Sequence, residues 1–199
     1  MTELAHSFRL ALRDGTRLAL RCIEPDDKQR LRDGVKHYSP QTLYRRFFAP
    51  VTELSPEQLK FLTEVDQVDH VAWIVVDEDH PEFPGIGVAR WVRLTDAPAI
   101  AETALIVQDA YQGRGIGTLL FAVLNETACA GGVTTLRSLV LGENNRFIAT
   151  LVGYGATKRH ESHGLMRVDL PVYPRGTTPP AAHYAAAIAA VRQRLSAGD

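Results

Sequence analysis

The chain has 199 residues and a formal net charge of −1, and 45% of its residues are hydrophobic. This composition is typical of a globular protein that buries one core without disulfides, and the charge gives no bulk attraction to nucleic acid or to an anionic membrane. The two cysteines, Cys22 and Cys129, lie among apolar neighbours, which argues against a disulfide framework and a cysteine-based metal site. No apolar run is long enough to cross a bilayer, and the first residues lack a signal-peptide pattern. We therefore expect a soluble, cytoplasmic protein with no nucleic-acid or membrane partner.

The N-terminal part is predicted to form a β-hairpin and then short helices. Apolar residues alternate on both sides of Asp14-Gly15, and glycine tolerates the positive φ of a tight turn. A helix is expected after Pro25, because acidic residues lead it and basic residues end it, as the helix dipole favours. Ser39-Pro40 and Ser55-Pro56 begin two further helices, each with a capping serine and a proline at the first helical position.

The pattern changes to strands near residue 70. Strands are predicted over 70–76, 85–94 and 100–107, then a helix over 115–130, a strand over 136–141, a helix over 144–152 and a last strand over 165–172. A hairpin, helices, antiparallel strands and a final β-α-β-α-β run together predict an α+β fold with a mixed sheet.

The C-terminal segment is predicted to be a proline-rich linker followed by an amphipathic helix. Tyr184, Ile188, Val191 and Leu195 form an apolar stripe at helical spacing. Docking on its own domain is the expected role of this stripe, and a subunit contact that makes a homodimer is the alternative. We accordingly divide the chain into a domain over 1–173 and a linker with helix over 174–199.

The segment with the clearest chemical meaning is the glycine-rich loop Gln112-Gly-Arg-Gly-Ile-Gly117, between a strand that ends near Val107 and the next helix. Three glycines at alternate positions let the backbone approach a ligand closely. The free amides and the dipole of the following helix N-terminus suit an anion such as a pyrophosphate. The alternative is a tight turn with no ligand.

Three kinds of phosphate loop can be compared with this sequence. A P-loop ends in Gly-Lys-Ser/Thr, and there is no lysine here, which disfavours ATP or GTP hydrolysis. The dinucleotide fingerprint G-x-G-x-x-G is one residue longer than the spacing of the three glycines. The pattern Q/R-x-x-G-x-G/A fits 112–117 directly.

That third pattern is the signature of the Gcn5-related N-acetyltransferase (GNAT) superfamily, which the chain resembles over about residues 8–173. The resemblance is closest to the bacterial protein-lysine acetyltransferases, whose recurring features are matched at 13–15, 45–48, 101–102 and 143–144. It implies a mixed, mostly antiparallel sheet flanked by helices, with acetyl-CoA as co-substrate and no metal.

The resemblance also implies which residues hold the cofactor. The loop cradles the pyrophosphate of acetyl-CoA, the splayed end of the strand before it lends main-chain groups to the pantetheine arm, and an asparagine after the next strand bonds that arm. In this sequence these residues are Leu105, Ile106, Val107, Gln112, Gly113, Arg114, Gly115, Ile116, Gly117, Thr118 and Asn144. Asn144 is also a good helix cap, and Arg114 and Arg146 are alternatively solvated or paired with CoA phosphates.

Glu102 is the candidate catalytic residue. A lysine ammonium has a pKa of about 10.4, so acetyl transfer to an amine requires a general base. By alternation Glu102 shares a strand face with apolar residues, which predicts a desolvated carboxylate with a raised pKa. The resemblance assigns the base to this position. A solvated strand-end glutamate is the alternative, and Glu143 is the second candidate base.

Several positions depart from the family pattern or have a simpler reading. Leu151 stands where many members carry a tyrosine that protonates the departing thiolate; Tyr154 is a possible substitute, or the thiolate leaves without an acid. His160 and His163 have metal-like spacing but no third ligand and are predicted to be solvated. Tyr44, Phe47 and Phe48 are predicted to be core residues, and substrate contact is the alternative, because helices at this place frame the acceptor groove in the family.

The sequence thus predicts an N-acetyltransferase that moves the acetyl group of acetyl-CoA to a primary amine. A protein lysine is the expected acceptor, because of the branch resemblance. A small-molecule amine is the enzyme alternative. A non-catalytic acyl-CoA sensor and a Rossmann-type nucleotide binder are the alternatives from other classes.

Overall fold

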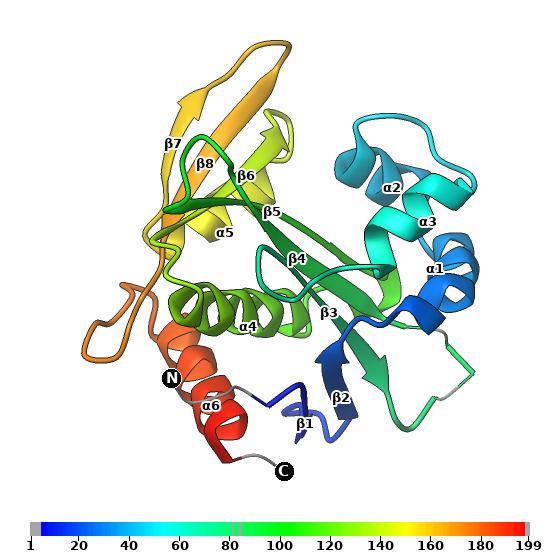
Figure 1. The fold of residues 1–199 in the computed structure, drawn as a ribbon, viewed down its shortest axis with the longest axis horizontal. Helices are drawn as coiled ribbons and strands as arrows, with labels where there is room; N and C mark the ends of the chain where they lie inside the picture. The colour runs from blue at the N-terminus through cyan, green and yellow to red at the C-terminus, as the bar shows by residue number, and fades with distance from the viewer. Residues whose placement is uncertain (1–4, 81, 84, 198–199) are drawn as a thin grey trace.

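A mixed eight-stranded sheet forms the centre of the computed structural model, which describes residues 5–80, 82–83 and 85–197 (Figure 1). The strand order is β1-β2-β3-β4-β5-β6-β8-β7, and every neighbouring pair is antiparallel except β5 and β6. This confirms the predicted fold class. The strands are β1 (Ser7–Ala11), β2 (Arg17–Cys22), β3 (His70–Asp77), β4 (Gly87–Arg93), β5 (Ile100–Val107), β6 (Thr135–Leu141), β7 (Thr157–His160) and β8 (Leu165–Pro171).

Helices cover both faces of this sheet, with α1–α3 on one side and α4 with α6 on the other (Figure 1). Ser39 and Ser55 cap α2 and α3 through their hydroxyls, as predicted, and Gly15 turns the first hairpin at a φ of +89°. The helix expected after Pro25 is an α-helix between two 3-10 turns. The helices are α1 (Lys28–Gly34), α2 (Pro40–Phe47), α3 (Pro56–Thr63), α4 (Ile116–Ala130), α5 (Asn145–Gly153) and α6 (Ala182–Ala197), and the 3-10 turns are η1 (Pro25–Asp27), η2 (Val35–His37) and η3 (Asp109–Tyr111).

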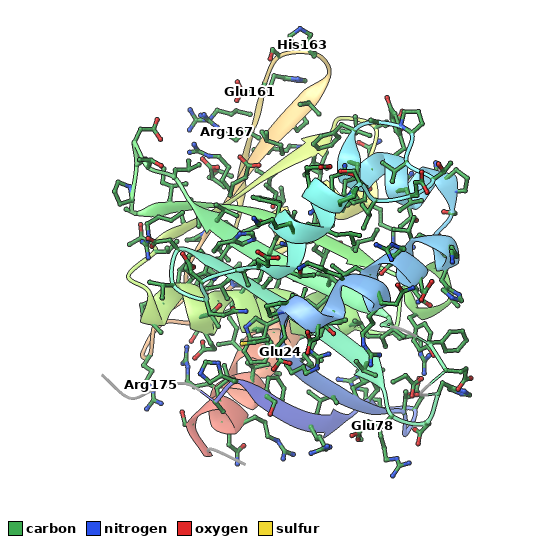
Figure 2. The ribbon with its side chains drawn as sticks, turned by 45° about the vertical axis from the view of Figure 1, so that its right-hand side comes forward. Glu24, Glu78, Glu161, His163, Arg167 and Arg175 are labelled. Atoms are coloured by element: carbon green, nitrogen blue, oxygen red, sulfur yellow. The ribbon has the colours of Figure 1, made fainter. Side chains whose placement is uncertain are left out.

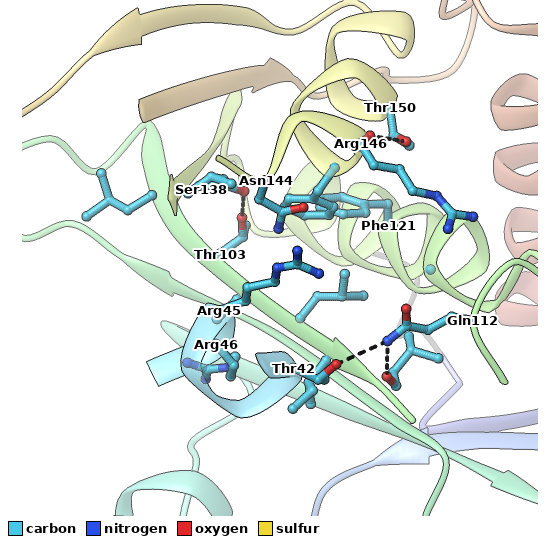
Figure 3. A pocket seen from close by; sticks show the side chains of 18 of the residues that line it. Thr42, Arg45, Arg46, Thr103, Gln112, Phe121, Ser138, Asn144, Arg146 and Thr150 are labelled. Atoms are coloured by element: carbon cyan, nitrogen blue, oxygen red, sulfur yellow. Dashed lines mark hydrogen bonds between the residues drawn. The ribbon is translucent and has the colours of Figure 1, made fainter. Parts of the chain in front are cut away.

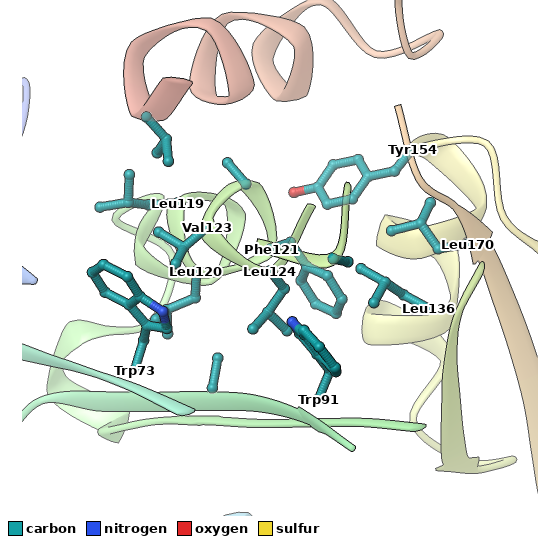
Figure 4. Close-up of a cluster of buried hydrophobic side chains, with 14 of the residues drawn as sticks. Trp73, Trp91, Leu119, Leu120, Phe121, Val123, Leu124, Leu136, Tyr154 and Leu170 are labelled. Carbon is teal, nitrogen blue, oxygen red and sulfur yellow. The ribbon is translucent and has the colours of Figure 1, made fainter. Parts of the chain in front are cut away.

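The main core lies between the sheet and α4 (Figure 4). Trp73 and Trp91 point from β3 and β4 toward α4, and the Trp91 indole donates a hydrogen bond of 2.9 Å to the Thr127 hydroxyl. All residues of α4 from Leu119 to Ala128 are buried, because the sheet covers one side of the helix and α6 the other. Burial of each large apolar side chain contributes about 1.5–3 kcal/mol. The helix that follows the glycine loop is therefore held rigidly.

The C-terminal helix docks on its own domain, which confirms the expected role of its stripe. Tyr184, Ile188, Val191 and Leu195 are all buried in the main core. An ion pair between Arg192 and Glu126 of α4, with N–O distances of 2.7 and 2.8 Å, adds to this contact. The stripe is covered within the chain and is not available to a second copy.

The hairpin of β7 and β8 is a feature that the sequence analysis missed. β7 has four residues, all exposed, so neither alternation nor an apolar run marks it as a strand. His160 ends β7 and His163 lies in the exposed turn that follows (Figure 2). Both histidines are exposed, as predicted, and the described residues contain no group of three His, Cys, Asp or Glu that could hold a metal. No helix within the described part of the chain is long and apolar enough to cross a membrane.

Candidate active site

The site is built around a gap in the sheet. β5 pairs with β6 only through Ile100–Thr103, whereas its pairing with β4 continues to Val107. The remaining half of β5, residues 104–107, therefore has no strand beside it on the β6 side, which confirms the predicted splay. A cavity of about 460 Å³, here called the β5–β6 cavity, opens at this gap (Figure 3).

The register of β5 identifies the backbone groups that face the gap. Alternate residues of a strand turn their N–H and C=O groups to the same side. Gln108 donates to Ile86 on the β4 side, and the Ala99 carbonyl accepts from Thr135 on the β6 side. The odd-numbered residues Leu105 and Val107 therefore face the gap. The Val107 carbonyl accepts a hydrogen bond of 3.1 Å from the Gln112 side chain, which leaves the Leu105 amide group directed at the cavity.

The wall of this cavity combines five segments that are far apart in the sequence. They are α2, the unpaired half of β5, the glycine loop with the start of α4, the end of β6, and α5. The lining residues are Thr42, Arg45, Arg46, Phe48, Glu102, Thr103, Ala104, Leu105, Ile106, Val107, Gln112, Gly113, Gly117, Phe121, Ser138, Leu139, Val140, Glu143, Asn144, Asn145, Arg146, Phe147 and Thr150.

The glycine loop enters α4 in a conformation that requires glycine. Gly113 and Gly115 have φ values of +79° and +91°, in the left-handed region. Gly115 is the N-cap of α4 and offers no side chain to the first amides of the helix, which remain suited to an anion. A Cβ on Gly117 would meet no atom within 4 Å, so the backbone here borders open space.

Four of the predicted cofactor residues lie elsewhere than in the cavity wall. The Arg114 guanidinium bonds the Asp14 carboxylate at 2.7 and 3.0 Å, and the Thr16 backbone N–H, followed by Arg114, lowers the pKa of Asp14 to about 2. Ile116 is buried in the core, and the Thr118 hydroxyl pairs with a tyrosine. These three side chains, together with the backbone of Gly115, do not line the cavity, so their contact with a cofactor stays a prediction. Leu105, Ile106, Val107, Gln112, Gly113, Gly117 and Asn144 all line it.

Glu102 lies on the cavity wall, next to the point where β5 and β6 separate. Its side chain is exposed, so the expectation of a desolvated carboxylate is wrong: the apolar residues of the same strand face do not close over it. Arg46 of α2 is the neighbouring cation. Burial lowers the pKa of Arg46 to about 10, and the Glu102 charge acts in the opposite direction. Glu143 is also exposed in the cavity wall and remains the second candidate.

Tyr154 does not replace the missing general acid. Its ring is 2% exposed and lies in the main core beside α4 (Figure 4). The ring stacks on Tyr184 with 4.2 Å between ring centroids, and its hydroxyl lies 2.7 Å from that of Thr118. Burial raises the pKa of Tyr154, and the residue does not line the cavity. The hypothesis that it protonates a thiolate is therefore wrong. Leu151 at the family position is fully buried.

Two arginines also line the site. The sequence left Arg146 open between solvent and a CoA phosphate, and it gave Arg45 no role there. Arg45 points from α2 into the cavity, and its buried Nε has no hydrogen-bond partner, whereas Arg146 reaches in from α5 (Figure 3). The signal for Arg45 was the segment 45–48, which matches a recurring feature of the bacterial protein-lysine acetyltransferases. Tyr44 and Phe48 are 42% and 38% exposed, so the prediction that they are core residues is wrong for these two, whereas Phe47 packs against the core beneath α1–α3.

No protein-family model matches the chain. Individual known proteins do match it. Acetyltransferase Pat of Mycolicibacterium smegmatis is 34% identical over 168 residues, which are 84% of this chain and 50% of Pat, so the chain spans about half the length of this curated relative.

Solved structures agree with this relationship. The yncA protein of Salmonella typhimurium, solved with acetyl-CoA, shares the fold at a TM-score of 0.62 and 16% identity, with 83% of this chain and 98% of that one covered. The GNAT domain of S. lividans PAT superposes with a TM-score of 0.76 at 30% identity, over 83% of this chain and 96% of that one. The chain therefore belongs to the Gcn5-related N-acetyltransferase superfamily, close to the bacterial protein acetyltransferases.

Proposed function

We propose that this chain is an N-acetyltransferase that moves the acetyl group of acetyl-CoA to a primary amine. The observation that carries the proposal is the gap between β5 and β6, where an unpaired strand backbone, a glycine loop for an anion and the Glu102 carboxylate line one cavity. The similarity to proteins named acetyltransferases supports it.

The cavity wall fits the parts of acetyl-CoA. The N-terminus of α4 and the arginines Arg45 and Arg146 suit its phosphates, because guanidinium groups and free helix amides both bind such anions. The buried, unpartnered Nε of Arg45 is a donor that a ligand in the cavity would satisfy. The unpaired edge of β5 suits the amides of the pantetheine arm, in the way that a strand edge pairs with a peptide.

The mechanism follows from the groups at the gap. Bound acetyl-CoA supplies the acetyl group as a thioester. The Leu105 N–H is placed to donate a hydrogen bond to the carbonyl oxygen, where negative charge develops as the amine attacks. Glu102 takes the proton that the amine must lose, and because this carboxylate is exposed, the proton passes on to water. The C–N bond forms, the C–S bond breaks, and the electron pair leaves with the thiolate.

A protein lysine is the proposed acceptor. The Glu102 side of the cavity is exposed, which suits a side chain presented by a large partner, and the Pat proteins are relatives of this chain. A closed, acidic pocket would instead suit a small amine. Any homodimer formed through α6 has to use a face other than the stripe that packs on α4.

Calorimetric titration of acetyl-CoA, free CoA and NAD tests the proposal first. We expect micromolar binding of acetyl-CoA and no binding of NAD, and then CoA release when a lysine-containing protein or a small amine is added. Release with peptides but not with small amines supports the protein acceptor. Binding without release to any amine supports the acyl-CoA sensor, and a folded protein that binds no acetyl-CoA contradicts the proposed function.

A further inference from the structure

A second, smaller cavity adjoins the active site on the side of the sheet that α1–α3 cover. It has a volume of about 50 Å³ and shares two wall residues, Arg46 and Ile106, with the β5–β6 cavity. Ile106 and Glu102 lie on the same face of β5, since they are four residues apart in a strand. The small cavity therefore lies on the side from which Glu102 reaches the reacting amine. We call it the arginine cavity after Arg46 and Arg90, which both line it.

Arg90 is a buried cation with no carboxylate among its hydrogen-bond partners. It is 3% exposed; one guanidinium nitrogen donates to the Leu62 carbonyl at 3.1 Å, another lies 3.0 Å from the His70 Nε2, and its Nε has no partner. Burial, followed by the charge of Arg90, lowers the pKa of His70 to about 4, so the imidazole is neutral and accepts this bond. The contacts of Arg90 are thus all with neutral groups.

The second arginine adds to the positive charge. The Arg46 guanidinium lies 4.9 Å from the centre of the Phe47 ring, and the opposing charge that acts on it is the exposed carboxylate of Glu102. Burial, followed by the charge of Arg46, lowers the pKa of Arg90 to about 9, so both groups stay charged at neutral pH. Arg90 is buried and Arg46 is half-buried, and within the described residues neither has a carboxylate among its hydrogen-bond partners. Such cations are costly to bury, and an anion between them would offset that cost.

The size and lining of the cavity select the kind of anion. A volume of about 50 Å³ has room for a carboxylate group. A planar carboxylate also matches the donor geometry of a guanidinium. Tyr38 in the same wall keeps its hydroxyl proton, because burial raises its pKa, and offers one more donor. Arg30, whose Nε lies 3.4 Å from a carboxylate oxygen of Asp27, is a further cation of the wall. Leu31, Val35, Leu43, Leu54, Leu62 and Val88 make the rest of the wall largely apolar.

We propose that the arginine cavity is a carboxylate-binding subsite of the acyl-transfer site. The carboxylate belongs to a molecule that reacts in the β5–β6 cavity: either the far end of a dicarboxylic acyl group carried by CoA, or an acidic group next to the acceptor amine. The inference rests on the proposed function, which it extends to the choice of substrate.

The first arm of the test compares succinyl-CoA with butyryl-CoA by calorimetry. The two acyl chains have equal length and differ in a terminal carboxylate against a methyl group. If the carboxylate comes from the acyl group, succinyl-CoA binds about tenfold or more tightly than butyryl-CoA, as one charge-assisted hydrogen bond allows. Arg90→Met abolishes this preference and leaves acetyl-CoA binding unchanged.

The second arm compares acetyl transfer to lysine peptides that carry Glu or Gln beside the lysine. If the carboxylate comes from the acceptor, the Glu peptides have a KM about tenfold lower in the wild type, and Arg90→Met removes the difference. Arg46→Met is the second variant, for use if Arg90→Met does not fold. Arg32→Met, an exposed change on α1 outside both cavities, is the matched control.

Each outcome separates the two proposals. A preference in the first arm assigns the subsite to the acyl group, and a preference in the second assigns it to the acceptor. Normal acetyl-CoA binding with no preference in either arm overturns the carboxylate subsite alone, as does a preference that survives in both arginine variants. Failure to bind acetyl-CoA overturns the proposed function and this inference with it.

Discussion

Glu102 stands where β5 separates from β6, with its carboxylate exposed in the cavity wall. Glu102→Gln keeps the size of the side chain and removes the base. We expect kcat to fall by roughly 10²–10⁴-fold, because general-base catalysis contributes about that much, while the Kd for acetyl-CoA stays within about twofold. Steady-state rates and calorimetry measure the two quantities. A normal rate in Glu102→Gln together with a slow Glu143→Gln would transfer the role to Glu143.

Gly117 is the position at which a side chain would block the cofactor without straining the backbone. It lines the cavity, its φ is not in the left-handed region, and a Cβ would point into open space. Gly117→Trp is expected to weaken acetyl-CoA binding by at least about a hundredfold, because the ring fills the space beside the loop. Gly153→Trp, at the end of α5 and outside the cavity wall, is the control and should bind normally. Equal affinity of the two variants would contradict the loop assignment.

The sequence predicted residues whose role depends on the backbone of their own segment, and it did not predict residues whose role depends on contacts with other segments. The loop 112–117 was predictable because the spacing of its glycines is visible in the sequence itself. Arg45 lies in a helix and Arg90 inside a strand, and no local spacing pattern distinguishes either from a solvated arginine. Their roles depend on the burial that only the assembled fold creates.

At the scale of elements, α6 is held by a largely buried ion pair as well as by its apolar stripe. Arg192 bonds Glu126 of α4, and the two side chains are 21% and 9% exposed. Arg192→Met removes the cationic partner and leaves the carboxylate with only the Asn125 amide, which donates to it at 2.9 Å, so we expect the free energy of unfolding to fall by about 2–4 kcal/mol. Arg194→Met, an exposed change on the same helix, should alter it by less than about 0.5 kcal/mol. Urea unfolding of both variants measures the difference, and equal stabilities would contradict the ion-pair argument.

Helices with capping residues or a regular apolar stripe were predictable from the sequence. A strand that exists only through its pairing with another strand was not. The capped helices α2 and α3 and the stripe of α6 are examples of the first kind. β7 is an example of the second, because it exists through its hydrogen bonds to β8 while its own residues are polar and exposed. The prediction that Tyr154 could act as the general acid failed for a similar reason. Helical spacing places it near position 151, where many family members carry the acidic tyrosine, but its ring packs between α4 and α6.

For the whole molecule, His70 predicts how stability depends on pH. Its pKa is lowered from 6.5 to about 4 in the folded protein, chiefly by burial. Between these values the unfolded chain binds a proton that the folded protein does not, so stability falls as the pH drops from 6.5 to 4. His70→Gln should flatten this dependence, whereas the exposed His160→Gln should not. Urea unfolding at pH 7, 5.5 and 4.5 provides the measurement, and parallel curves for wild type and His70→Gln would contradict the assignment.

The gap in the sheet also affects how fast the amides of β5 exchange their hydrogens with solvent. The amides of Ala104 and Ile106 face β4 and are paired, whereas that of Leu105 faces the cavity. In the free protein, Leu105 should therefore exchange its amide proton far faster than both neighbours. Cofactor binding should slow this amide and that of Val107, which faces the same gap, and leave those of Ala104 and Ile106 unchanged. The Leu105 amide proton thus reports whether the site is occupied, without any substrate being turned over.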